Sequence, residues 1–194
     1  ETAANEHINV FLNKFYELIA PGLFKPLIDN KFSDYSSAIY LVKLVKFIAI
    51  IHTRDISRKF ILQNSLMQNI SKLAMDPNST LQLKLASIRC LTCIISLNDE
   101  KYIDCVISEN VLLSVFELLN ENKFKDNLCT STILDFVKNI MDLKQDTKSA
   151  KSIRNFVALK DYILINFHDV LANMNTEPLI QDFLSLDNRE RGQL

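Results

Sequence analysis

Residues 79–97 read STLQLKLASIRCLTCIISL, and this stretch decides the fold. Ser79 follows a proline by two residues, and because proline cannot continue a helix, a serine at this place can cap the next one. Apolar residues then recur at intervals of three, which places them on one helix face. They are Ile88, Leu91 and Ile94. We therefore predict a long helix that is capped by Ser79 and ends at Leu97.

The same apolar pattern returns along the chain at a fixed interval. Ile51, Leu97 and Leu143 each close a predicted long helix, at equal intervals of 46 residues. Shifting the apolar face by this interval gives three columns that are apolar throughout: Val42, Ile88, Leu134, Ile180; Val45, Leu91, Val137, Phe183; and Ile48, Ile94, Ile140, Leu186. Helical repeats of roughly 40–47 residues are typical of armadillo and HEAT proteins, in which stacked repeats bury one continuous core. The sequence predicts an all-α, armadillo/HEAT-like right-handed helical repeat solenoid.

Shorter helices are predicted between the long ones, in the order short, medium, long. The expected helices span 8–19, 34–51, 53–61, 65–75, 79–97, 99–108, 110–119 and 126–142, then a short helix from Thr147, a medium one to Met174 and a last one from Thr176 to Asn188. The first has one apolar face, made of Ile8, Phe11, Leu12, Phe15, Leu18 and Ile19. Residues 1–194 then form a single array, with an incomplete repeat at 1–51 and repeats at 52–97, 98–143 and 144–190.

Composition excludes several classes of function. The 22 basic and 23 acidic side chains nearly balance, so the basic surplus that nucleic acids attract is missing. Two glycines in 194 residues leave no phosphate-binding loop or nucleophile elbow. The longest apolar stretch, 39–51, contains two lysines and is shorter than the about 20 residues that cross a bilayer. We expect neither direct nucleic-acid binding nor a membrane span.

Cysteine and histidine spacing offers little chemistry. Cys90 and Cys93 have the spacing of a metal or redox pair, but both lie inside a predicted helix without a second pair, and zinc needs four ligands. Packing is the favoured role of these thiols, which we expect to be reduced in the nucleus or cytosol. His52 falls at the end of a long helix, where its ring can meet the helix dipole. We expect no metal, no cofactor and no catalytic residues. An enzyme is only the third hypothesis for the function of this chain, after the two that are given below.

A polar face lies opposite the apolar columns of the long helices. In armadillo arrays the long third helix lines a concave groove, so this face is the candidate partner-binding surface. Its proposed contact residues are Tyr40, Lys43, Phe47, Arg89, Asp135 and Asn139. One column across the repeats reads Lys43, Arg89, Asp135 and Gln181, a ladder of long polar groups. A merely solvated helix face is the alternative, and the exposed aromatic residues favour a contact anchor.

Several short motifs follow one another in order. They are Phe47-Ile48-Ala49-Ile50-Ile51-His52-Thr53; Phe60-Ile61-Leu62-Gln63-Asn64; Arg89 with Ile94-Ile95-Ser96-Leu97-Asn98-Asp99-Glu100 and Tyr102; and Asn127-Leu128 with Ser131 and Ile133-Leu134-Asp135-Phe136. Together they resemble the central helical region of the protein phosphatase 4 regulatory subunit 3 (SMEK) family, and the degree of divergence suggests a fungal member. The chain departs from the family at Ser96, where glycine is expected, and at Lys43, where an acid is expected. Only Phe47, Arg89 and Asp135 are therefore carried over as site residues.

The resemblance implies a non-catalytic regulatory or targeting scaffold subunit of a serine/threonine protein phosphatase 4 complex. Its partners would be the phosphatase catalytic subunit, which would hold any metals, a second regulatory subunit, and phosphoprotein substrates in DNA-damage checkpoint recovery. The location would be the nucleus, with the cytoplasm as a further possibility. A start without methionine suggests a fragment of a longer protein, in which the family has a PH-like domain before the array and a low-complexity tail after it. An unrelated armadillo-type peptide-binding adaptor, of importin or catenin type, is the alternative, although this chain lacks the tryptophans of importin grooves.

Overall fold

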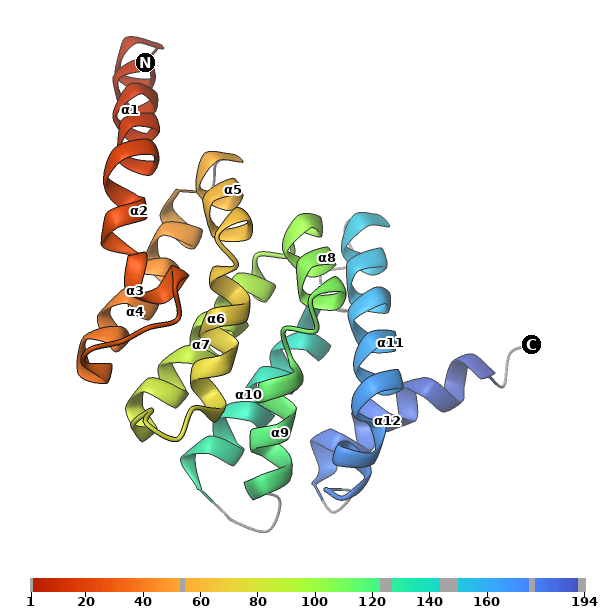
Figure 1. Cartoon of the computed structure of the whole chain (residues 1–194). Coiled ribbons are helices and arrows are strands. Elements are labelled where there is room, and N and C mark those ends of the chain that lie inside the picture. The colour runs from red at the N-terminus through yellow and green to blue at the C-terminus, as the bar shows by residue number, and fades with distance from the viewer. Residues whose placement is uncertain (1, 53–54, 123–126, 144–149, 175–176, 192–194) are drawn as a thin grey trace.

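The computed structural model of the chain describes residues 2–52, 55–122, 127–143, 150–174 and 177–191 (Figure 1). Within these ranges the secondary structure is helical and no strand occurs. The elements are α1 (Thr2–Lys14), a π-helical turn η1 (Phe15–Ile19), α2 (Ala20–Leu23), α3 (Lys25–Ile28), α4 (Tyr35–Ile51), α5 (Asp55–Gln63), α6 (Leu66–Met75), α7 (Leu81–Ser96), α8 (Glu100–Ser108), α9 (Leu113–Asn122), α10 (Leu128–Leu143), α11 (Ala150–Ala172) and α12 (Pro178–Arg191). Not one of these helices combines the length and the apolar content that a membrane span needs.

The helices stack in two layers that run along the molecule (Figure 1). One layer contains the long helices: α4 packs on α7, α7 on α10, and α10 contacts α12. The other layer runs from α3 through α6 and α9 to α11, and α6 and α9 pack against α7 and α10. Each helix contacts its neighbours in the stack, which is the architecture of an all-α helical repeat solenoid.

The predicted apolar columns form the core between the layers. All twelve residues are buried except Leu134 and Leu186, which are half-buried. The long helices α4, α7 and α10 end at Ile51, Ser96 and Leu143, within one residue of the ends that the 46-residue interval sets. The register of the long helices is therefore confirmed, and the division of the chain into repeats stays an interpretation.

Side-chain caps begin α4, α8 and α10. Asp34 accepts hydrogen bonds from the backbone N–H groups of Ser36 and Ser37, at 2.9 and 3.2 Å, at the start of α4. Asp99 caps α8 in the same way, and Asn127 caps α10. These residues satisfy N–H groups that have no partner inside the helix, which explains why the helices begin where they do.

The predicted cap of α7 is wrong by one residue. Thr80, and not Ser79, accepts the hydrogen bond from the N–H of Leu83, at 3.3 Å. The backbone N–H of Ser79 instead donates to the carbonyl of Asp76, at 3.0 Å, so Ser79 still belongs to the preceding turn. Its hydroxyl is buried and has no hydrogen-bond partner among the described residues.

The C-terminal part of the array differs from the predicted short and medium helices. Residues 150–172 form the single helix α11, with a kink at Phe167. In the preceding repeat, Asn110 has a φ of 50° and separates α8 from α9, so that α9 begins at Leu113 rather than at Asn110. No residue of α11 has a positive φ, so the helix continues through this region. The predicted caps Thr53, Thr147 and Thr176 lie outside the described residues.

The apolar face predicted for the first helix is mostly exposed. Leu12 is buried, but Phe11 and Leu18 are 62% and 72% exposed. Ile8 and Ile19 are also exposed, and Phe15 is half-buried. The buried side is instead formed with Tyr16 and Ala20, because the π-helical turn η1 changes the register between α1 and α2.

Candidate protein-interaction face

The exposed side of the α4, α7 and α10 layer carries all six residues predicted as contacts. Tyr40, Lys43 and Phe47 come from α4, Arg89 from α7, and Asp135 and Asn139 from α10. Each is exposed, and the two aromatic side chains are 70% and 53% accessible. We call these six residues the candidate face. The structure brings them to the same side of one layer, and their role in binding stays a prediction.

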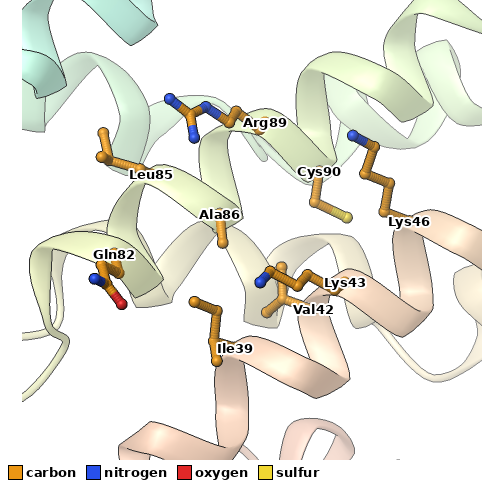
Figure 2. Close-up of a pocket in the computed structure, with 9 residues that line it drawn as sticks. All are labelled: Ile39, Val42, Lys43, Lys46, Gln82, Leu85, Ala86, Arg89 and Cys90. Atoms are coloured by element: carbon orange, nitrogen blue, oxygen red, sulfur yellow. The ribbon is translucent and has the colours of Figure 1, made fainter.

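A hollow of about 370 Å³ opens between α4 and α7 (Figure 2). Its floor is apolar, and its polar side chains come from both helices. The floor contains Ile39, Val42, Leu85, Ala86 and Cys90, and the polar side chains are Lys43, Lys46, Gln82 and Arg89. This volume lies within the range of about 300–1,000 Å³ that ligand sites occupy. We call this feature the α4/α7 hollow.

Lys46 is the site residue that the sequence reasoning missed. It interrupts the apolar stretch 39–51 and was considered there only as a residue that prevents a membrane span. The structure places it, half-buried, beside the hollow (Figure 2). Its position three residues after Lys43 is the signal that could have found it, because residues at this spacing lie on one helix side.

The hollow continues toward the N-terminal ends of α4 and α7. A second space of about 560 Å³ is lined by Tyr35, Ser36, Tyr40, Thr80 and Leu81, and it shares Ile39 and Gln82 with the first. Residues early in α4 face residues early in α7, so the two helices run in the same direction along their line of contact, which we call the seam. An extended segment of several residues can therefore lie along the two helices.

Positive charge dominates this part of the candidate face. The sequences of α4 and α7 contain four basic residues and no Asp or Glu; the four are Lys43, Lys46, Lys84 and Arg89. Lys43 has its Nζ 5.8 Å from the centre of the Tyr40 ring, a cation–π distance. On α10 the sign changes, with Asp135 exposed and the Asn139 amide donating to the Asp135 carbonyl at 2.7 Å. The candidate face therefore has a basic part on α4 and α7 and an acidic residue on α10.

Phe47 stands beside the C-terminal end of α4. Its ring meets the His52 ring edge-on, with centroids 6.4 Å apart. His52 ends the helix as expected, with its N–H donating to the Ile48 carbonyl at 3.0 Å. The Nδ1 atom of His52 lies 2.7 Å from the Tyr16 hydroxyl. These contacts assign His52 a structural role between α4 and the N-terminal helices.

A smaller hollow of about 140 Å³ near this end contains residue types that hydrolases use. It is lined in part by His52, Ser57, Arg58, Asp99 and Tyr102. However, the Ser57 hydroxyl donates to the backbone carbonyl of His52. The Asp99 carboxylate pairs with Arg58, which also pairs with Asp55. In a hydrolytic triad the acid orients the histidine ring, whereas here the Asp99 carboxylate is directed at Arg58.

Of the two cysteines in α7, Cys90 lines the α4/α7 hollow. Cys90 is fully buried in its floor, and burial raises the pKa of the thiol to about 12. The thiol therefore stays protonated at neutral pH, while reactive and metal-binding cysteines act as thiolates. Among the described residues, no three His, Cys, Asp or Glu side chains gather as metal ligands would. The packing interpretation fits this burial, and the expectation of no bound metal is tested below.

Comparison with known proteins identifies relatives over nearly the whole chain. The family model described as Phosphatase 4 regulatory subunit 3 matches residues 2–188. Three fungal proteins named Serine/threonine-protein phosphatase 4 regulatory subunit 3 are similar. The protein of Eremothecium gossypii is 35% identical over 91% of this chain and 21% of its own length. That of Kluyveromyces lactis is 33% identical over 95% and 26%, and that of Candida glabrata 39% identical over 87% and 20%.

The chain spans about a fifth to a quarter of the length of these relatives. No solved structure matches it. The family match covers both the long helices that carry the candidate face and the buried columns beneath them. This chain therefore belongs to the phosphatase 4 regulatory subunit 3 family.

Proposed function

We propose that this chain is the scaffold region of a non-catalytic regulatory subunit, which binds a serine/threonine protein phosphatase 4 catalytic subunit and a second regulatory subunit and directs them to phosphoprotein substrates. The observation that carries the proposal is the family match over residues 2–188. The subunit would act in the nucleus, during recovery from a DNA-damage checkpoint. Membership of the family sets aside the alternative of an unrelated armadillo-type adaptor.

The candidate face supports a binding role. Tyr40 and Phe47 expose large aromatic surface on an otherwise polar helix side, and aromatic residues are common energetic anchors in protein interfaces. Tyr40 lines the space that adjoins the α4/α7 hollow, and the hollow can receive a side chain of a partner. A rigid stack of helices holds these groups in place before binding, which lowers the entropic cost of association.

The chemistry of dephosphorylation is assigned to the catalytic partner. In the small hollow near the end of α4, the serine hydroxyl is engaged with a backbone carbonyl and the acid with an arginine. The Cys90 thiol is buried and protonated. We therefore propose that this subunit contributes position and selection of the substrate, and that its partner contributes the reactive groups.

Affinity purification of the tagged full-length protein tests the proposal. We expect a phosphatase 4 catalytic subunit and a second regulatory subunit to be recovered in stoichiometric amounts, and phosphatase activity to accompany them. A variant with Leu91→Asp, which removes a central core contact, is the control and should recover neither. Repeated purification of the folded wild-type protein without any phosphatase would contradict the proposed function.

A further inference from the structure

The α4/α7 hollow brings three cationic side chains to one small space. Lys43 and Lys46 approach it from α4 and Arg89 from α7 (Figure 2). These three side chains form no ion pair with any carboxylate in the part of the chain that the structure describes. Neighbouring like charges repel one another, so the arrangement is stabilised when an anion enters.

Three basic side chains elsewhere on the molecule are paired with carboxylates. Arg58 is neutralised by two carboxylates, and Lys151 and Arg154 lie near Glu100, at 3.8 and 3.1 Å. Since α4 and α7 contain no acidic residue, neither helix supplies such a partner at the hollow. Its charge is therefore available to a ligand from outside the described chain.

A phosphorylated side chain fits this arrangement better than a single carboxylate. A phosphate ester carries about −1.5 to −2 charges at pH 7 and three strong acceptor oxygens. An arginine can bind two of these oxygens together, and lysines add point charges from other directions. The three cationic side chains that line the α4/α7 hollow equal in number the three acceptor oxygens of a phosphate ester.

The apolar floor and the length of the seam indicate that the ligand is a peptide segment and not a free ion. Ile39 and Ala86 line the hollow and are only half-buried, so they offer surface that an aliphatic side chain beside the phosphate can cover. Beyond Gln82 the seam leads into the second space of about 560 Å³. An extended segment can thus place one phosphate at the cations and its following residues along α4 and α7.

We propose that the α4/α7 hollow binds a phosphoserine- or phosphothreonine-containing acidic segment of a partner protein, with Lys43, Lys46 and Arg89 holding the phosphate. The inference deepens the proposed function and rests on it. For a regulatory subunit of a phosphatase, such a site retains a substrate through one phosphate while a second phosphate on the same protein reaches the catalytic subunit. Substrates with several phosphates are then favoured over those with one.

The test uses the full-length subunit and a fluorescein-labelled ten-residue peptide that carries one phosphoserine, a leucine two residues after it, and glutamates elsewhere. Fluorescence anisotropy compares it with the same peptide carrying unmodified serine or glutamate in place of the phosphoserine. We expect the phosphopeptide to bind at least about tenfold more tightly than both, because the phosphate makes several charge-assisted hydrogen bonds. Its affinity should fall below about pH 6, where the phosphate gains a proton, and should fall as salt rises.

Two charge-reversed variants locate the site. Lys43→Glu with Arg89→Glu should remove the preference for the phosphopeptide. Lys72→Glu with Lys101→Glu is the matched control, since it makes the same change of net charge at exposed residues of α6 and α8, which do not line the α4/α7 hollow. Circular dichroism of each variant should match that of the wild type, because exposed substitutions change stability little.

Several results would overturn the inference. They are equal binding of the serine, glutamate and phosphoserine peptides, an equal loss in the two variants, or competition by a DNA oligonucleotide as effective as that by unlabelled phosphopeptide. The same preparations are assayed for recovery of the catalytic subunit. Recovery without a phosphopeptide preference contradicts only this site, whereas absence of any phosphatase contradicts the proposed function itself.

Discussion

Single residues of this protein take their properties mainly from burial. Cys90 and Cys93 are three positions apart on α7, yet the first is fully buried and the second is half-buried. Burial disfavours the thiolate, so the pKa of Cys90 rises from 9.0 to about 12. Spacing alone suggests a reactive pair, and it is the environment of the first thiol that makes it a core residue.

Alkaline pH should reveal this burial. Because the folded-state pKa of Cys90 is raised, the stabilising contribution is complete below the unfolded value of 9.0 and is lost as pH rises toward about 12. We expect the free energy of unfolding, measured with urea at pH 8, 9 and 10, to fall with pH in the wild type. Cys90→Ala should fall less steeply, and an equal slope in both proteins would show that this thiol is not buried as described.

Metal content gives a second prediction at this scale. A protonated, buried Cys90 cannot act as a thiolate ligand without disrupting the core. Elemental analysis of the purified regulatory subunit, separated from its phosphatase partner, should find no stoichiometric zinc, and Cys90→Ser with Cys93→Ser should not change the metal content. One zinc per chain, lost in the double variant, would contradict the packing role.

The start of α7 shows how a helix boundary depends on its surroundings. Thr80→Ala should lower stability by about 1 kcal/mol, because it removes the side-chain cap on the N–H of Leu83. Ser79→Ala is the matched control and should be nearly neutral, since the Ser79 hydroxyl has no hydrogen-bond partner among the described residues. Urea unfolding of the two variants measures the difference. The reverse order of stabilities would restore Ser79 as the cap.

The exposed sides of α4 and α7 provide the functional prediction for the elements. Phe47→Ala with Arg89→Glu should leave the fold nearly intact, within about 0.5 kcal/mol. Loss of an aromatic anchor and reversal of a charge that meets an acidic partner should weaken partner binding by about 2 kcal/mol, roughly thirtyfold. Quantitative co-purification of the phosphatase and its substrates measures this loss.

The control for this variant changes helices that do not line the α4/α7 hollow. A substitution of Arg58 would be unsuitable as this control, because Arg58 is paired with Asp55 and Asp99 and its loss would disturb the contact between α5 and the start of α8. Lys72→Glu with Lys101→Ala changes exposed residues of α6 and α8 instead. If this control abolished capture while Phe47→Ala with Arg89→Glu bound like wild type, the working surface would be on the opposite side.

At the scale of the whole molecule, stability depends on the continuous core between the two layers. Leu91 is fully buried in the central column, on the helix that packs against both α4 and α10. Leu91→Asp loses about 1.5–3 kcal/mol of side-chain burial and adds an unpaired buried carboxylate. We expect loss of helicity and cooperative unfolding, followed by circular dichroism. Ser96→Asp, an exposed change on the same helix, should melt near the wild-type temperature, and an unchanged melting temperature for Leu91→Asp would contradict the register.

Much of the fold could be predicted from the sequence because repeat proteins are built from local units. The apolar columns, the ends of α4, α7 and α10, and the cap at Asp99 all follow from residues close together in the chain. The six residues of the candidate face are all exposed, as expected because helical periodicity fixes which residues point away from a core. Their function as a contact surface remains to be measured.

Tertiary structure alone decided two features, and each depends on a neighbour that is distant in sequence. Periodicity shows that Phe11 and Leu18 belong to an apolar face but not whether another element covers it, and in this structure both are exposed. The α4/α7 hollow exists because two helices about 45 residues apart pack side by side and bring Lys46 to the same space as Arg89. A sequence determines which surfaces a helix has, whereas packing determines which of them meet.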